Sequence, residues 1–108
     1  MIRQTRTASR QVDDLLAEYM RRNWDEAIMN LDRAFRDAIE RIEADPTVGA
    51  KYPRPYPELE GYGFLWIESH IYWIGYSMAK GYPVITNFFN KKHDIINRIA
   101  IEDEEIGL

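Results

Sequence analysis

The chain has 108 residues, no cysteine and a formal net charge of −4 at neutral pH. This length fits one domain with its own core. The lack of cysteine excludes disulfides, thiolate metal sites and a cysteine nucleophile, and it suits a reducing cytoplasm. No apolar run approaches the ~20 residues of a membrane helix, and no apolar block follows the N-terminal arginines as in a secretory signal. Because residues 102–105 are all acidic, the rest of the chain is neutral and makes no strong electrostatic case for nucleic acid.

The first fifth of the chain predicts a strand followed by a helix. Residues 2–7 alternate weakly, which is typical of an edge strand; the alternative is a basic arm. Ser9 can cap a helix that ends near Arg22. Its apolar face is formed by residues at helical spacing: Val12, Leu15, Leu16, Tyr19 and Met20.

The second helix gives the clearest pattern in the sequence. Asn23 can cap it, with Glu26 reaching back as in a capping box. Apolar residues then follow the helical repeat for about five turns: Trp24, Ala27, Ile28, Leu31, Phe35, Ala38, Ile39 and Ile42. The short gap between the two helices predicts an antiparallel hairpin, which ends at Asp45 because Pro46 follows it.

Residues 46–63 are rich in proline, glycine and tyrosine, which predicts an extended loop. Lys51, Arg54 and Tyr56 mix cations with aromatic rings, as a nucleic-acid contact would. The alternative is a loop strapped across the sheet edge by its tyrosines.

Three strands are expected next, over residues 64–69, 71–78 and 84–89, with the last two joined as a hairpin. Side chains should alternate between the two faces, which places Trp66 and Ile67 on opposite sides. Both faces of this meander are largely apolar, and two helices can cover only one of them. We therefore expect the other face to be exposed for a partner protein. The candidate partner-binding residues are Trp66, Trp73, Tyr72, Phe88 and Trp24.

The predicted fold is α+β: an N-terminal strand, a helix hairpin packed on a small antiparallel sheet (β-α-α-β-β-β), and a short C-terminal helix. That last helix would begin near Asp94 and dock Ile95, Ile96 and Ile99. Residues 1–101 form one domain, and residues 102–108 form an acidic tail expected to be solvated and mobile.

This order of elements, with several short motifs, resembles the RelE/ParE superfamily of bacterial type II toxin–antitoxin toxins, also called plasmid stabilisation proteins. The motifs are Asp14-Leu15, residues 45–49 (DPTVG), Glu58-Leu59, residues 70–76 (HIYWIGY) and residues 90–95 (NKKHDI). The resemblance covers residues 3–98. It implies a small cytoplasmic toxin that forms a hetero-oligomer with a cognate antitoxin, which fills grooves by the helix hairpin and the sheet.

Two activities are known in that family. One branch cleaves mRNA on the ribosome, with cations and a tyrosine or histidine on the sheet; the ParE branch inhibits DNA gyrase without a catalytic set. Gly63, Phe64, Asn90 and His93 stand where the family often has arginine or histidine. The strands at 64–67 and 84–89 also lack cations.

These departures favour the ParE-like branch, a toxin that acts by binding. The alternatives are a metal-independent, ribosome-dependent endoribonuclease and a partner-binding module that has lost toxicity. Metal-free RNA cleavage needs an acid, a base and a cation near the scissile phosphate. Candidate residues for that chemistry are His93, Lys92, Lys91, Arg54 and Tyr56. Neither His70 nor His93 has metal-ligand spacing around it, so no metal or cofactor is expected.

Overall fold

The computed structural model describes residues 2–54, 56–92 and 105–107. The elements in chain order are β1 (Arg3–Thr5), α1 (Arg6–Arg21), α2 (Asp25–Ala44), the 3-10 helix η1 (Pro57–Tyr62), β2 (Leu65–Ser69), β3 (Tyr72–Ser77), β4 (Val84–Asn90) and β5 (Glu105–Gly107). The five strands form one mixed sheet in the order β2-β3-β4-β1-β5. The chain is therefore an α+β protein with the predicted β-α-α-β-β-β core. His93, the predicted helix near Asp94 and residues 102–104 lie outside the described residues.

Helix α1 begins four residues earlier than a Ser9 cap would place it. The Thr5 hydroxyl oxygen accepts a hydrogen bond from the Ala8 backbone N–H at 3.1 Å. Thr5 therefore caps the helix from the last position of β1, so the strand passes directly into the helix. The prediction of a Ser9 cap is wrong.

The turn between the helices is built by backbone hydrogen bonds. Asn23 adopts a left-handed conformation with φ of 55°, which asparagine tolerates better than most residues. The Trp24 N–H donates to the Tyr19 carbonyl at 2.9 Å, and the Asn23 N–H donates to the Met20 carbonyl at 3.2 Å. This pattern is a Schellman motif that ends α1. Asn23 is thus not the cap of α2, whose N-cap position is Trp24 without a side-chain cap bond, and the predicted capping box is wrong.

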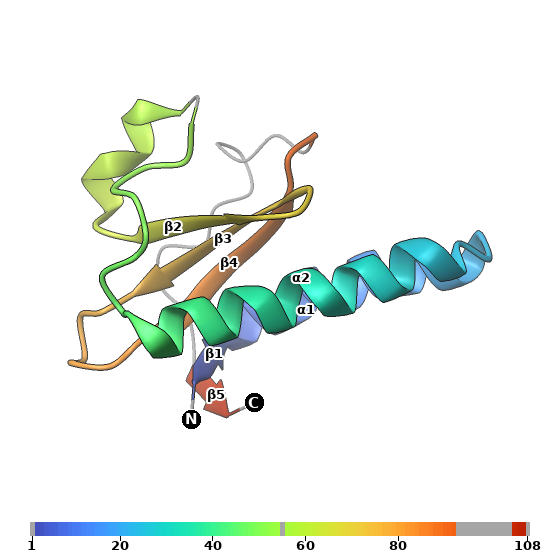
Figure 1. Cartoon of the computed structure of the whole chain (residues 1–108), viewed down its shortest axis with the longest axis horizontal. Helices are drawn as coiled ribbons and strands as arrows, with labels where there is room; N and C mark the ends of the chain where they lie inside the picture. The colour runs from blue at the N-terminus through green and yellow to red at the C-terminus, as the bar shows by residue number, and fades with distance from the viewer. Residues whose placement is uncertain (1, 55, 93–104, 108) are drawn as a thin grey trace.

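The helix hairpin covers one face of the sheet and projects past the end of the strands (Figure 1). Helix α1 packs on β4, and α2 packs on β2. The first core lies between these layers and includes Leu15, Leu31, Ile42, Ile74 and Phe88. The apolar faces predicted for both helices are confirmed, except that Met20 and Trp24 near the turn are exposed.

The three predicted strands and their side-chain alternation are confirmed. Leu65 and Ile67 of β2 face the first core, whereas Trp66 faces the opposite side of the sheet. The hairpin from β3 to β4 is antiparallel, with a bulge where Gly75 pairs with Asn87 but the next residue pairs with Ile85. Trp66 lies opposite Gly75 in the pairing of β2 with β3, and its ring fills the space that a side chain at that glycine would take.

The opposite face of the sheet is covered by the segment of residues 50–64, which we call the strap. The strap joins the outer edge of β2 through two 2.7 Å backbone hydrogen bonds between Ala50 and Trp66. It then turns over the sheet through η1, on the side away from the helices (Figure 1). A second core forms beneath it from Leu59, Phe64, Trp66, Trp73 and Phe89.

The expectation of an exposed sheet face is therefore wrong. The strap alternative for residues 46–63 is confirmed in outline, but its main anchors are Pro53, Leu59 and Phe64. Tyr56 packs against the second core, while Tyr52 and Tyr62 are exposed.

Strand β1 is not an edge strand. It pairs parallel with β4 on one side and antiparallel with β5 on the other. Arg3, Gln4 and Thr5 each have a pairing partner in β5, which consists of residues 105–107. These residues of the acidic tail are thus paired into the sheet, and the expectation of a mobile end is wrong for them.

Candidate functional site

A cleft of about 620 Å³ opens between α2, the strap and the second face of the sheet. We call it the cationic cleft because its lining includes three cations and one carboxylate. Its polar lining residues are Arg41, Arg54, Tyr56, Glu68 and Lys91, and the rings of Trp66 and Trp73 form part of its wall.

Strand alternation brings Glu68, Trp73 and Lys91 to the same face. Glu68 lies opposite Trp73 in the β2–β3 pairing, and Trp73 lies opposite Phe89 of β4. Lys91 follows Phe89 by two positions and therefore emerges on the same face. The Lys91 N–H donates to the Ile71 carbonyl at 2.9 Å, so the pairing of the two chains continues past the end of β4.

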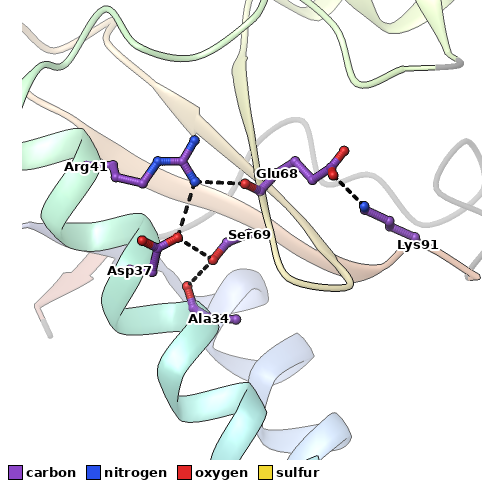
Figure 2. A network of polar contacts seen from close by, with 6 residues as sticks. All are labelled: Ala34, Asp37, Arg41, Glu68, Ser69 and Lys91. Carbon is purple, nitrogen blue, oxygen red and sulfur yellow. Dashed lines mark hydrogen bonds and ion pairs between the residues drawn. The ribbon is translucent and has the colours of Figure 1, made fainter.

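The Lys91 ammonium has two contacts in the cleft. Its Nζ lies 2.6 Å from Glu68 Oε1, forming an ion pair (Figure 2). The same Nζ lies 5.8 Å from the centre of the Trp73 ring, within the range of a cation–π contact. Lys91 is therefore held between both members of one cross-strand pair.

Arg41 is held at the cleft by a network that joins α2 to β2 (Figure 2). Its Nη1 donates to the Glu68 carbonyl oxygen at 2.8 Å and to Asp37 Oδ2 at 3.2 Å. The buried Ser69 hydroxyl lies 2.8 Å from the same Asp37 oxygen and 2.9 Å from the Ala34 carbonyl oxygen. The Ser69 hydrogen bond, followed by the bond and charge of Arg41, lowers the pKa of Asp37.

The cleft collects three of the five residues predicted as candidates for RNA chemistry. Arg54 and Tyr56 reach it from the strap, and Lys91 reaches it from the end of β4. Lys92 is exposed and does not line the cleft; its N–H donates to Asn90 Oδ1 at 2.9 Å in the turn after β4. His93 lies outside the described residues.

Two charged residues of the cleft, Arg41 and Glu68, were not predicted as site residues. Arg41 lies four positions after Asp37 on the charged face of α2, and an acid–base pair at that spacing is also typical of a solvated helix surface. Nothing in the sequence indicates that Ser69 would hydrogen-bond to Asp37, or that Arg41 would donate to the Glu68 carbonyl oxygen.

Four of the five predicted partner-binding residues are buried. Trp66 and Trp73 belong to the second core, whereas Tyr72 and Phe88 belong to the first. None of these four offers an open face to a partner, because the strap and the helices already cover them. Trp24 is the exception: 48% of its surface is exposed at the tip of the helix hairpin, with Arg22 stacked 4.9 Å from its ring.

A second hollow of about 480 Å³ lies between the two helices, and its lining is mostly apolar. We call it the hairpin groove; it is lined by Val12, Leu16, Ile28, Met29, Leu31, Asp32 and Phe35. Met29 is 53% exposed there, and Met20 near the tip of the hairpin is 60% exposed.

The two sites differ in chemistry. The cationic cleft can bind an anion through guanidinium and ammonium groups, with the Tyr56 hydroxyl and the Glu68 carboxylate beside them. The hairpin groove can bind an apolar side chain or helix face. Within residues 2–54, 56–92 and 105–107, no group of three or more His, Asp or Glu side chains could hold a metal ion.

The sequence matches no model of a known protein family and no curated protein. Among the described helices, none combines the length and apolar character needed to cross a membrane.

Proposed function

We propose that this protein is the toxin component of a bacterial type II toxin–antitoxin system. In this proposal it is ParE-like and inhibits an essential target such as DNA gyrase by binding to it in the cytoplasm. A cognate antitoxin neutralises it by forming a hetero-oligomer. The observation that carries the proposal is the helix hairpin, which projects past the sheet (Figure 1) and has a mostly apolar groove between its helices.

The hairpin groove is long enough to hold two turns of a bound helix. Its lining on α2 runs from Ile28 to Phe35, which is two helical turns or about 10 Å at the usual rise per residue. An amphipathic helix presents apolar side chains at one-turn intervals and fills such a groove with two or three of them. We assign this groove to the antitoxin.

The strands also support a toxin that acts by binding. Strands β2, β3 and β4 contain no lysine or arginine, and both faces of the sheet are covered. A catalytic set spread across the sheet, as the family's nuclease branch has, is therefore absent from these three strands.

Gyrase supercoiling assays with the purified protein test the target. We expect supercoiling to be inhibited at micromolar protein, and unaffected supercoiling would count against gyrase as the target. Induction of the gene without its neighbour tests toxicity itself: growth should stop, whereas undisturbed growth would favour the non-toxic binding module.

The assignment of the groove has its own test. We expect Met29→Gln to weaken copurification with the antitoxin encoded beside the gene, because it places a polar amide in the apolar groove. Glu40→Gln, on an exposed part of the same helix, is the matched control and should copurify normally. Equal copurification of both variants would place the antitoxin elsewhere.

The cationic cleft favours a second candidate, the ribosome-dependent endoribonuclease. Arg41, Arg54 and Lys91 converge there from three separate parts of the chain, and such a set can bind the phosphates of single-stranded RNA. We expect Arg54→Gln to abolish transcript cleavage on translating ribosomes if this candidate is correct. Intact transcripts with the wild-type protein would exclude it.

A further inference from the structure

The Glu68 carboxylate occupies the part of the cationic cleft where an anion would bind. It lies 2.6 Å from the Lys91 ammonium, a spacing at which a ligand phosphate oxygen would also sit. Arg41 holds the backbone of the same residue through its carbonyl oxygen. Glu68 is thus fixed at both its main chain and its side chain, inside a cleft whose other charged lining residues are cations.

We infer that Glu68 is an internal competitor that sets the ligand specificity of the cationic cleft. The favoured ligand is a single-stranded polyphosphodiester, which displaces the Glu68 carboxylate from Lys91. This inference rests on RNA binding at the cleft, the second function proposed above.

The specificity follows from comparing the contacts that each ligand would gain and lose. A small anion that displaces Glu68 replaces one ion pair of Lys91 with another, so it gains little net free energy. A polyphosphodiester can pair one phosphate with Lys91 and a neighbouring phosphate with Arg54. The Arg54 side chain is exposed and forms no ion pair with another described residue. Glu68 therefore weakens the binding of both ligand classes at Lys91, and only a ligand with several phosphates keeps a net gain, through its second contact with Arg54.

One feature of the cleft lining suits such a ligand. Tyr56, which is partly buried, lies among the cations of the lining, and bases can stack on aromatic rings irrespective of sequence.

Binding of a fluorescently labelled oligouridylate, measured by anisotropy at low salt, tests the inference. Glu68→Gln keeps the size of the side chain but removes its charge, and it should tighten binding about threefold, the scale of an exposed ion pair. The salt slope should also steepen by up to about 0.7, because only in the wild type does a displaced Glu68 carboxylate take up a cation, which offsets part of the counterion release from the ligand. Inorganic phosphate should compete more effectively against the variant than against the wild type.

Glu60→Gln is the matched control, because Glu60 is an exposed carboxylate on η1 that does not line the cleft. It should leave both the affinity and the salt slope nearly unchanged. Glu68→Gln behaving like Glu60→Gln, or binding more weakly than wild type, would overturn the inference.

Arg54→Gln separates this inference from the function on which it rests. We expect it to weaken binding about tenfold, the scale of a hydrogen bond to a charged group. Weakening by Arg54→Gln without tightening by Glu68→Gln would reject the competitor and leave RNA binding intact. Wild-type protein without measurable binding, or with binding that Arg54→Gln does not alter, would reject both.

Discussion

The hydroxyl oxygens of Tyr19 and Tyr72 lie 2.7 Å apart and form a hydrogen bond inside the first core. The bond links α1 to β3, two elements separated in sequence by α2, the strap and β2. Tyr72 is fully buried and Tyr19 is nearly so. Each hydroxyl therefore has the other as its hydrogen-bond partner in place of water.

Removal of either hydroxyl should destabilise the fold. We expect Tyr72→Phe to lower the free energy of unfolding by about 1–2 kcal/mol, because it leaves the Tyr19 hydroxyl buried without this partner. The double variant with Tyr19→Phe should cost less than the sum of the single variants. Urea unfolding measures both quantities, and strictly additive costs would show that the two hydroxyls are not coupled.

The free energy of unfolding should fall at alkaline pH because of Tyr72. Burial, followed by the hydrogen bond to Tyr19, raises the pKa of Tyr72 well above its usual range. The unfolded chain releases this proton near pH 10, whereas the folded chain keeps it. The contribution of Tyr72 is thus complete below about pH 10 and is lost as the pH rises above that value.

Urea unfolding between about pH 9 and pH 11 measures this loss. The free energy of unfolding of Tyr72→Phe should decline less over this pH range than that of the wild type. Some decline should remain, because burial also raises the pKa of Tyr76. Tyr62→Phe, at an exposed position, should decline like the wild type, and an identical decline in all three proteins would contradict the prediction.

Gly75 should not tolerate a side chain. A Cβ there would lie 3.0 Å from two ring atoms of Trp66, closer than van der Waals contact allows. We expect Gly75→Ala to lower the free energy of unfolding by about 1–3 kcal/mol, the usual cost of overpacking. Gly61→Ala is the control, since a Cβ at Gly61 would meet no atom within 4 Å. Equal stability of the two variants would show that the indole moves aside freely.

Leu59 should anchor the strap. Its side chain is 1% exposed beneath η1, and Leu59→Ala should cost about 2–4 kcal/mol. In a Trp24→Phe background the remaining tryptophans are Trp66 and Trp73, both in the second core. Their emission should therefore shift to longer wavelength as the strap loosens. Glu58→Ala, exposed on η1, should cause no shift, and a shift of equal size in this control would refute the anchoring role.

The Asp37–Ser69 hydrogen bond should stabilise the protein in a pH-dependent way. Because the folded state lowers the pKa of Asp37, this stabilisation is present above the ordinary value of about 3.9. It is lost as the pH falls through the lower folded value. The gap in unfolding free energy between wild type and Ser69→Ala should therefore narrow between about pH 6 and pH 2. A gap that stays constant would assign the whole effect of Ser69 to its contact with Ala34.

The alternation of the strands could be predicted from sequence because its physical cause is local. Trp66 and Ile67 point to opposite faces because of backbone geometry alone, and both placements are confirmed. The hairpin of helices is equally local, since it needs only two apolar stripes and a short gap. The cap of α1 was predicted wrongly because serine and threonine satisfy similar rules, and the choice depends on where β1 ends. Asn23 was predicted wrongly as a cap because asparagine also favours the left-handed conformation that ends α1.

The covering of the second face could not be predicted, because it depends on Leu59 and Phe64 in a segment without periodicity. Proline and glycine around these residues indicate a loop but do not show on which side of the sheet it lies. The cationic cleft is a consequence of that position: Arg54 and Tyr56 meet Lys91 only because the strap crosses the face of the sheet on which Lys91 emerges. Arg41 also lines the cleft, but it lies on a charged face of α2 whose sequence is typical of any solvated helix surface.

The position of β1 between β4 and β5 affects how this chain can fold. The Thr5 hydroxyl reaches the Thr86 carbonyl oxygen across 81 positions of sequence. Closing so long a loop costs about 4 kcal/mol of chain entropy beyond its constant part, and the two contacting segments emerge from the ribosome far apart in time. The helix pair and the meander can form from near neighbours, so β1 should dock after them, and β5 can dock only once β1 is in place. Until the meander has formed, β1 stays unpaired and accessible to chaperones.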